Sequence, residues 1–491
     1  MCQRPCCPLL PRLTRARAWA LYLPLLLVFV ALNQYPLLGF ILTELTVILF
    51  AVFAWRLRLF VEPPDAQGDV EALLQRAGAG GGGGGPAPAS RVAYLDAVKA
   101  ILAVVVILHH TIGAFAGGGS LGLSVGNFRN ALQPVFSAVQ TLNQAYFMSL
   151  FFFISAFFAP GSVARKGAAG FLKDRATRLG APFLPFLLLL GPALMFLVQW
   201  AQGAGTWAYI PYAGPLWFVC WLGIFCYFYG MVAEDGGAGA FVRCELPGPC
   251  ALLGVGLGLG VLQGVQMVGA SAFPLMPIAW GSLPFDVAFF YAGVLAKRNG
   301  WLDAPLPRRL VLSARAYAAL FIAATFAGYF CLHAVGGGGF LLSANACGAA
   351  VDRSGKVGDG VGIGIVMAVA TASGPYTIFM SIAVLDVARW ALEGRSLPPW
   401  LKFLSDNAYA AYIFHPVVVF PATAGFIAII RRQGLPMVWA GGSADSASCV
   451  AEGSQEPALL AGFLAVTAVS LLGTYVLTAL VRKIPGAGKV L

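Results

Sequence analysis

The chain has 491 residues, of which 59% are apolar and only 10% are charged. Because soluble domains carry about 25% charged residues, this composition excludes a soluble globular enzyme, a disordered chain and a fibrous repeat. The formal net charge is +11, but the charges fall in short segments between apolar runs, where they indicate membrane topology rather than nucleic-acid binding. The sequence therefore predicts an all-α polytopic membrane protein that has no nucleic-acid partner.

The ten cysteines are scattered along the chain. No Cys-x-x-Cys pair occurs, and no histidine stands at metal-ligand spacing from a cysteine, so the pattern argues against a zinc site or a disulfide framework. We therefore expect no metal site.

The first 91 residues predict a membrane anchor followed by a linker. Crossing the hydrocarbon core takes about 20 apolar residues. Residues 18–34 and 36–57 are the two candidates, so residues 1–60 are expected to form an anchor with one or two spans. Because no small-residue cleavage site follows, we expect a retained anchor rather than a removed signal peptide. Residues 61–91 contain six consecutive glycines and predict a flexible, Gly/Pro-rich cytosolic linker.

Residues 92–491 predict a core domain with ten spans. With both termini placed in the cytosol, the segments on that side, such as the loops 161–178, 297–315 and 389–402, hold 26 of the 31 lysines and arginines. A bias of this size is typical of the cytosolic side, so both termini are expected there, whereas the identity of the membrane stays open. The ten apolar stretches lie near residues 96–116, 143–160, 180–200, 215–232, 251–270, 284–297, 316–335, 360–386, 407–430 and 457–481.

The first core stretch carries ionisable residues where a bilayer makes them costly. Eleven helical steps separate Lys99 from His110, which leaves an angular offset of about 20° and an axial distance of about 16 Å. The two therefore share a face, and His110 lies near mid-membrane if Lys99 lies at the cytosolic interface, where Asp96 can pair with it. A histidine at that depth is a candidate general base, whereas His109 points elsewhere and is expected to be structural. The alternative is that Asp96 and Lys99 are interfacial anchors and that His110 only bonds a neighbouring helix.

Two further groups of polar residues are candidates for binding. Arg175 and Arg178 are three residues apart, so on a short helix their guanidinium groups would lie side by side and suit phosphate oxygens; the alternative is a contribution to the positive cytosolic side alone. Tyr409, Tyr412 and His415 are also three apart and form one stripe on a helix. That stripe predicts either an acceptor-binding surface or a packing surface.

Five segments, in order along the chain, resemble motifs of the acyltransferase-3 family of integral-membrane acyltransferases. The resemblance extends from about residue 92 to residue 484. The chain departs from the family pattern in having Ala156 where glycine is usual, Lys99 where arginine is more frequent, and Ser120 where some members have an acidic residue. The five segments are Asp96-x-x-Lys99 with His110, the aromatic stretch 151–158 around Ser155, Arg175-x-x-Arg178, Pro215-Leu216-Trp217-Phe218, and Ser405 to Pro416 with Tyr409, Tyr412 and His415.

The resemblance implies a ten-helix acyltransferase core that follows the one or two N-terminal spans. It also implies transfer of an acyl group, expected to be acetyl from acetyl-CoA, to a hydroxyl of a glycan, a lipid or a small metabolite. Acyl-CoA would be a co-substrate rather than a tightly bound cofactor, and membrane lipids would surround the protein. Carried over by position, His110 would be catalytic, Lys99, Arg175 and Arg178 would bind the donor phosphates, and Asp96, Ser155, Trp217, Tyr409, Tyr412 and His415 would support the site or face the acceptor.

Two other functions remain open at this point. A polytopic solute transporter could use His110 and Lys99 as a relay, but its typical sign is a pair of repeated halves with broken helices, and the sequence contains no internal repeat. A family member without turnover, acting as a membrane scaffold or receptor, is compatible with the departures at Lys99 and Ala156.

Overall fold

The computed structural model describes residues 90–116, 123, 125, 131–201, 209, 212–234, 244–270, 282–334, 360–433, 456–484 and 487. Within these ranges the regular structure is helical and no β-strand occurs. The prediction of an all-α polytopic membrane protein is thereby confirmed. The anchor predicted for residues 1–60 and the linker predicted for 61–91 lie outside the described residues, except that the first core helix already begins at Ser90.

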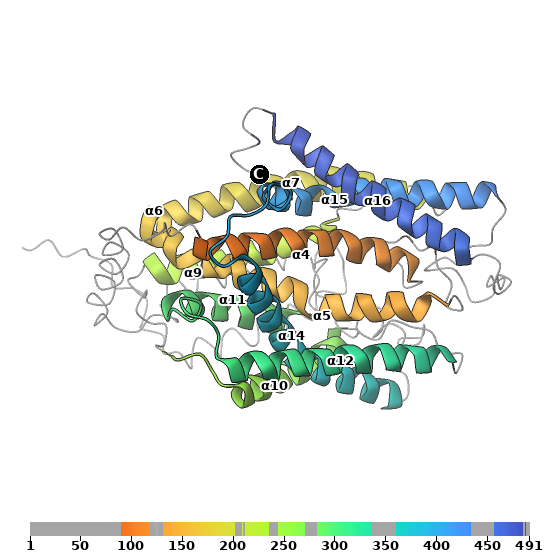
Figure 1. Ribbon diagram of the computed structural model, residues 1–491. Helices are drawn as coiled ribbons and strands as arrows, with labels where there is room; N and C mark the ends of the chain where they lie inside the picture. Colours follow the sequence, from red (N-terminus) through yellow and green to blue (C-terminus); the bar gives the residue numbers. More distant parts are fainter. Residues whose placement is uncertain are drawn as a thin grey trace, which may run out of the picture.

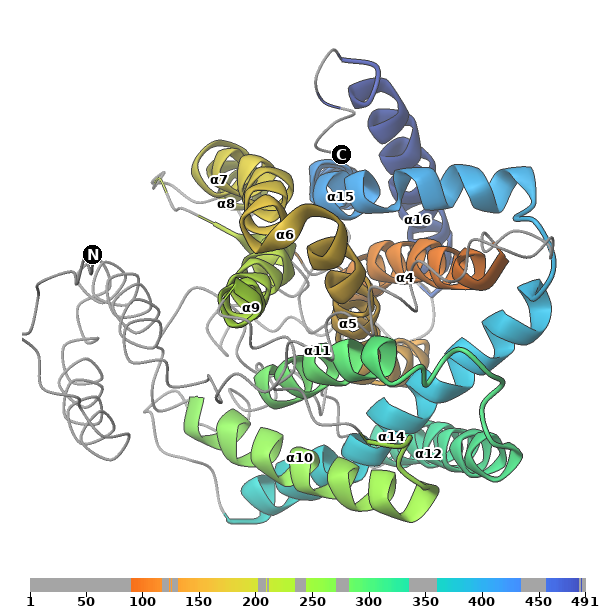
Figure 2. The same ribbon diagram turned by 90° about the vertical axis from the view of Figure 1, so that its left-hand side faces the viewer.

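The helices run side by side along the length of the molecule in Figure 1, and Figure 2 views the bundle from one end. In chain order they are α4 (Ser90–Phe115), α5 (Gln133–Phe157), α6 (Ala159–Arg175), the π-helix η2 (Ala176–Gly180), α7 (Ala181–Pro185), the π-helix η3 (Phe186–Leu190), α8 (Gly191–Ala201), the 3₁₀-helix η4 (Gly214–Leu216), α9 (Trp217–Glu234), α10 (Pro249–Ala270), α11 (Leu283–Arg298), α12 (Arg308–Ala334), α14 (Gly360–Leu392), α15 (Pro399–Arg432) and α16 (Glu456–Val481).

Eight helical segments in the described ranges are long and apolar enough to cross a membrane. They correspond to eight of the ten predicted core spans. The other two, predicted at 143–160 and 284–297, fall on α5 and α11, which are helices but are either too short or not apolar enough to count as candidate spans. Helix α11 has only 16 residues, and α5 carries buried polar residues such as Gln133, Gln140 and Thr141, which lower its mean hydropathy.

The segment 161–178, expected as a cytosolic loop, is helical on both sides of a break at Gly167. Helical residues extend from Ala159 to Ala201 and include the two π-helical segments, but Gly167, with φ of 69°, departs from helical geometry and marks a kink between two helices. Glycine adopts a positive φ without strain. Asp174 Oδ1 lies 3.0 Å from Nζ of Lys166, on the other side of this break, and 3.8 Å from Nε of Arg178, one turn further along. The helices therefore continue into the predicted loop from both sides and leave the break at Gly167.

Helix α4 lies at the centre of the bundle, packed against α5, α14, α15 and α16. The small residues Ala97, Ala100 and Ala103 are fully buried on it. Without a hydrophobic force between helices in lipid, small side chains stabilise association by allowing close packing. The residues that follow on α4 are therefore held on a helix with neighbours on several sides.

Glycines bring α10 and α14 into close contact. Gly256 and Gly260 lie one turn apart on α10 and face Gly374 and its neighbours on α14. A Cβ atom at Gly260 would lie 2.6 Å from the carbonyl oxygen of Ala370, so a side chain there must push the helices apart. Gly258, on the same helix, has open space around its Cβ position.

We expect Gly260→Leu to destabilise the protein by about 1–3 kcal/mol, because overpacking forces the two backbones apart. The midpoint of thermal unfolding of the detergent-purified protein measures the effect. Gly258→Leu is the matched control and should leave the midpoint near that of the wild type. Equal midpoints for the two variants would contradict close packing of α10 on α14.

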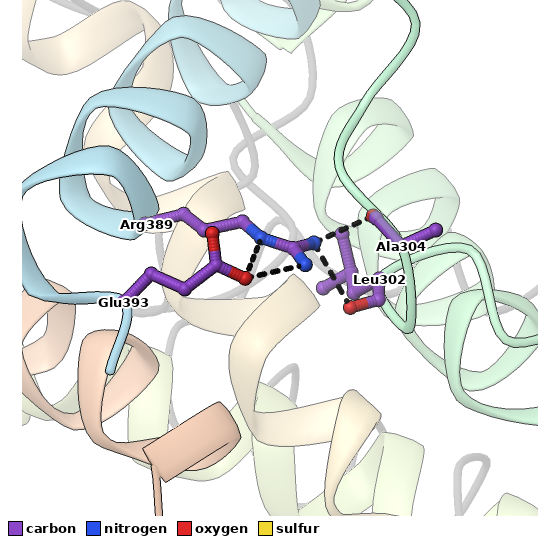
Figure 3. Close-up of polar contacts among 4 residues, drawn as sticks. All are labelled: Leu302, Ala304, Arg389 and Glu393. Carbon is purple, nitrogen blue, oxygen red and sulfur yellow. Dashed lines mark hydrogen bonds and ion pairs between the residues drawn. The ribbon is translucent and has the colours of Figure 1, made fainter.

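The connection between α11 and α12 is fastened to α14 by Arg389 (Figure 3). Arg389 Nη1 donates to the carbonyl oxygens of Leu302 at 3.2 Å and Ala304 at 2.5 Å, while Nε and Nη2 donate to Oε1 of Glu393 at 3.1 and 2.9 Å. Residues 389–402 are predicted as a cytosolic loop, but α14 continues to Leu392 and Arg389 is buried on it. Its contacts identify it as a structural residue.

Replacing Arg389 by methionine should lower the free energy of unfolding by about 2–3 kcal/mol, since it removes the donor from two carbonyl groups and one carboxylate. The control is Arg395→Met, because Arg395 is exposed, follows the end of α14 and its side chain donates to the carbonyl oxygen of Ala391, four residues earlier. Thermal unfolding in detergent measures both. If the two variants unfold at the same temperature, the Arg389 contacts do not stabilise the fold.

Candidate active site

Helix α4 carries two adjacent histidines into the centre of the bundle, and they differ in surroundings. His109 is buried and packs on Phe147 of α5, with ring centroids 5.0 Å apart. The His110 ring meets that of His109 edge-on at 5.5 Å but is only half-buried. His109 is thus part of the packed interior, while His110 retains a surface that a ligand could contact.

His110 stacks on a third histidine, His415 of α15. The two rings lie with their centroids 5.1 Å apart and their planes 19° from parallel. The structure therefore brings together the first and the last of the motifs singled out in the sequence. His415 is fully buried, so the stack closes one side of His110.

The orientation of His415 follows from the proline beside it. Pro416 has no N–H group, so the carbonyl oxygen of Tyr412, four residues earlier, loses its helical hydrogen-bond partner. The Nδ1 atom of His415 lies 2.7 Å from that oxygen. Since a carbonyl oxygen only accepts, Nδ1 must carry the hydrogen. The Nε2 atom is then the acceptor of the neutral ring, and it is buried without a hydrogen-bond partner among the described residues.

The two tyrosines of the late stripe bond to the backbone of other motifs. The Tyr412 hydroxyl donates to the carbonyl oxygen of Pro215, at the start of the Pro-Leu-Trp-Phe segment. The Tyr409 hydroxyl donates to the carbonyl oxygen of Arg178 at 2.5 Å. Both hydroxyls therefore act as packing elements that fix α15 against η4 and η2. Trp217, at the start of α9, packs its ring 6.5 Å from that of Phe152.

The basic residues predicted for phosphate binding have different surroundings. Lys99 forms the expected pair with Asp96, Nζ to Oδ1 2.6 Å, and lies 5.0 Å from the centroid of the Phe158 ring. Arg178 lies on η2, half exposed, with Asp174 as its ionic neighbour. Lys99 and Arg178 are thus each paired with a carboxylate, which an incoming phosphate would have to replace.

Arg175 faces a pocket instead. Its guanidinium carbon lies 5.2 Å from the centroid of the Phe171 ring, and its Nε is buried with no hydrogen-bond partner among the described residues. The pocket has a volume of about 620 Å³ and lies between the α6–α7 run and α9, with apolar walls that include Leu179 and Ile224. Arg175 ends α6 and Arg178 belongs to the π-helical turn that follows, and both arginines lie close enough to Asp174 and Tyr409 to act on them electrostatically.

The aromatic stretch also explains one departure from the family pattern. Ser155 is half-buried on α5, and the next residue is Ala156. Opposite them on α11 lies Gly293, where a Cβ atom would come within 2.9 Å of the Ala156 Cβ. A Cβ atom at Gly293 would also collide with the backbone carbonyl oxygen of Phe153. The absence of a side chain at Gly293 thus lets α11 approach the α5 backbone and leaves room for the Ala156 methyl group.

Sequence reasoning missed two features of this region. One is the pocket beside Arg175, which depends on the packing of α9 and has no sequence signal. The other is the orientation of His415, for which a signal exists: a His-Pro pair inside an apolar span frees one carbonyl group for the ring. Within the described residues no group of three His, Cys, Asp or Glu side chains is placed to hold a metal ion.

Comparison with known proteins identifies the family. The family model for acyltransferase-3, described as an acyltransferase domain, matches residues 92–479. No curated protein and no solved structure matches the chain significantly. The matched region covers most of the chain and contains every predicted site residue in the order expected. The chain therefore belongs to the acyltransferase-3 family and is a multi-pass membrane acyltransferase.

Proposed function

We propose that this protein moves an acyl group, expected to be acetyl, from acyl-CoA to a hydroxyl of a glycan, a lipid or a small metabolite. The observation that carries the proposal is the half-buried ring of His110 on the central helix, stacked on His415. An imidazole with accessible surface inside a bundle is suited to proton transfer or to attack on a carbonyl.

The donor enters from the cytosolic side, the side on which the charge bias predicts both termini. Lys99, Arg175 and Arg178 contact its phosphates. Lys99 precedes His110 by about 16 Å along the axis of α4, so the phosphates stay near the surface while the thioester extends toward the histidine. The free Nε of Arg175 beside the pocket supports this assignment, because an unpaired buried guanidinium nitrogen is costly until an anion binds.

Two versions of the transfer use the same residues. In the direct version, His110 removes the proton of the acceptor hydroxyl, the oxygen attacks the thioester carbonyl, and CoA leaves as its thiol after taking up a proton. In the relay version, His110 attacks the thioester first and carries the acyl group before the acceptor arrives. Both versions require His110.

His110→Ala should abolish loss of the thioester when labelled acetyl-CoA is added to the detergent-purified protein, because it removes the reacting imidazole. His333→Ala, on α12, is the matched control and should react like the wild type. A folded His110→Ala variant with full activity would contradict both versions. Solute uptake into vesicles without an acyl donor would favour a transporter instead.

Arg175→Gln should raise the dissociation constant for acetyl-CoA about tenfold, since a hydrogen bond between charged groups contributes about 1.5–3 kcal/mol. Equilibrium binding of the labelled donor measures this value. Arg309→Gln, which removes an exposed arginine from the first turn of α12, is the control for net charge. Equal weakening by the two variants would mean that Arg175 acts only through general electrostatics.

A further inference from the structure

The buried Nε2 atom of His415 has no part in the function proposed above. Pro416 frees the Tyr412 carbonyl, the Nδ1–H group bonds to it, and Nε2 is left as an acceptor without a partner in the described part of the chain. A buried acceptor without a donor is unfavourable. A ligand that brings an O–H group to this atom would offset that cost.

The partner of Nε2 is not the ring of His110. The two rings are stacked 5.1 Å apart with their planes 19° from parallel, and rings in that arrangement present their nitrogen lone pairs outward in two nearly parallel planes. A substrate that reaches both ring edges therefore meets two separate nitrogen atoms. One nitrogen atom can therefore hold the acyl group while the other accepts a proton.

We propose that the stacked pair divides the reaction: His110 carries the acyl group, and His415 is the base that activates the acceptor. This inference rests on the proposed function and selects its relay version. It adds a second catalytic residue, with a hydroxyl group of the acceptor as its ligand.

The acyl group is transferred in two steps. A ring nitrogen of His110 attacks the thioester carbonyl, the carbon–sulfur bond breaks, and CoA leaves as a thiolate. The acceptor hydroxyl then donates to Nε2 of His415, and its oxygen attacks the acyl carbon as the proton passes to Nε2. The carbon–nitrogen bond breaks and restores His110. The proton on His415 is finally taken up by the thiolate or by water, so that acyl-CoA and alcohol give ester and free CoA.

The stacking suits this division geometrically. An acyl group on His110 conjugates with its ring and lies in the ring plane, so a nucleophile must approach it from above or below. A hydroxyl bonded to the parallel ring of His415 lies on such a side. Because His415 is fully buried and its Nε2 atom is covered, the side chains over that atom must move to admit the hydroxyl group.

The test separates the two half-reactions. Labelled acetyl-CoA is mixed with the full-length protein in detergent, with water and added glycerol as the hydroxyl probes, and released CoA and transferred acetyl are followed in time. We expect His415→Asn to release about one equivalent of CoA and to leave the acetyl group on the peptide that contains His110. Its steady turnover should fall by about 100-fold or more. Asparagine keeps an N–H group for the Tyr412 carbonyl and lacks an atom at the Nε2 position.

A second pair of variants tests the orientation of the ring. Pro416→Ala restores a backbone N–H for the Tyr412 carbonyl and should lower turnover while the first release of CoA persists. Pro421→Ala, in the same helix, is the matched control and should behave like the wild type. The chain has only four histidines, so ¹⁵N-histidine NMR can report the ring directly. A neutral ring protonated at Nδ1 should appear in the wild type and vanish in His415→Asn.

The outcomes are distinguishable. A wild-type protein that releases no CoA contradicts the proposed function, and this inference with it. Wild-type turnover that His415→Asn leaves unchanged overturns the inference alone. Loss of the first CoA release in His415→Asn, with donor binding intact, also overturns it, because His415 would then act before the acyl group is transferred. A ring protonated at Nε2 would exclude its role as the base.

Discussion

Inside a bilayer every backbone N–H and C=O group must find its partner within the protein, and the site described here depends on that constraint. Pro416 interrupts the hydrogen bonds of α15, and the carbonyl of Tyr412 is satisfied by the ring of His415. The same helix is fixed on two further backbone oxygens, of Pro215 and Arg178, through its tyrosines. The need to satisfy backbone groups thus orients the histidine that stacks on His110.

Much of the fold could be predicted because the bilayer leaves few choices: long apolar runs must be helices. The prediction failed where charge was taken as a sign of a loop. Residues 161–178 are helical on both sides of a break at Gly167, with Lys166 paired to Asp174 across the break and Arg178 paired to Asp174 within one turn. Arg389 is buried because it bonds two carbonyls of another segment. Neither pairing is visible until the chain is folded.

Part of the site was predictable because its residues lie on one helix. Regular helical spacing predicts the Asp96–Lys99 pair and the different surroundings of His109 and His110. It did not give the stacking of His110 on His415, because that contact depends on how α4 and α15 pack. Regular spacing could not show the π-helical turn that contains Arg178, nor that Arg175 lines a pocket beside it.

The close approach of Gly293 to α5 has a consequence for how the sequence varies. A Cβ atom at Gly293 would meet the Ala156 side chain and also the backbone carbonyl oxygen of Phe153. Because that oxygen is present whatever side chain stands at position 156, a relative with glycine there would still have no room for alanine at position 293 without a shift of α11 against α5. We therefore expect evolution to hold position 293 to glycine more strictly than it holds the residue that faces it.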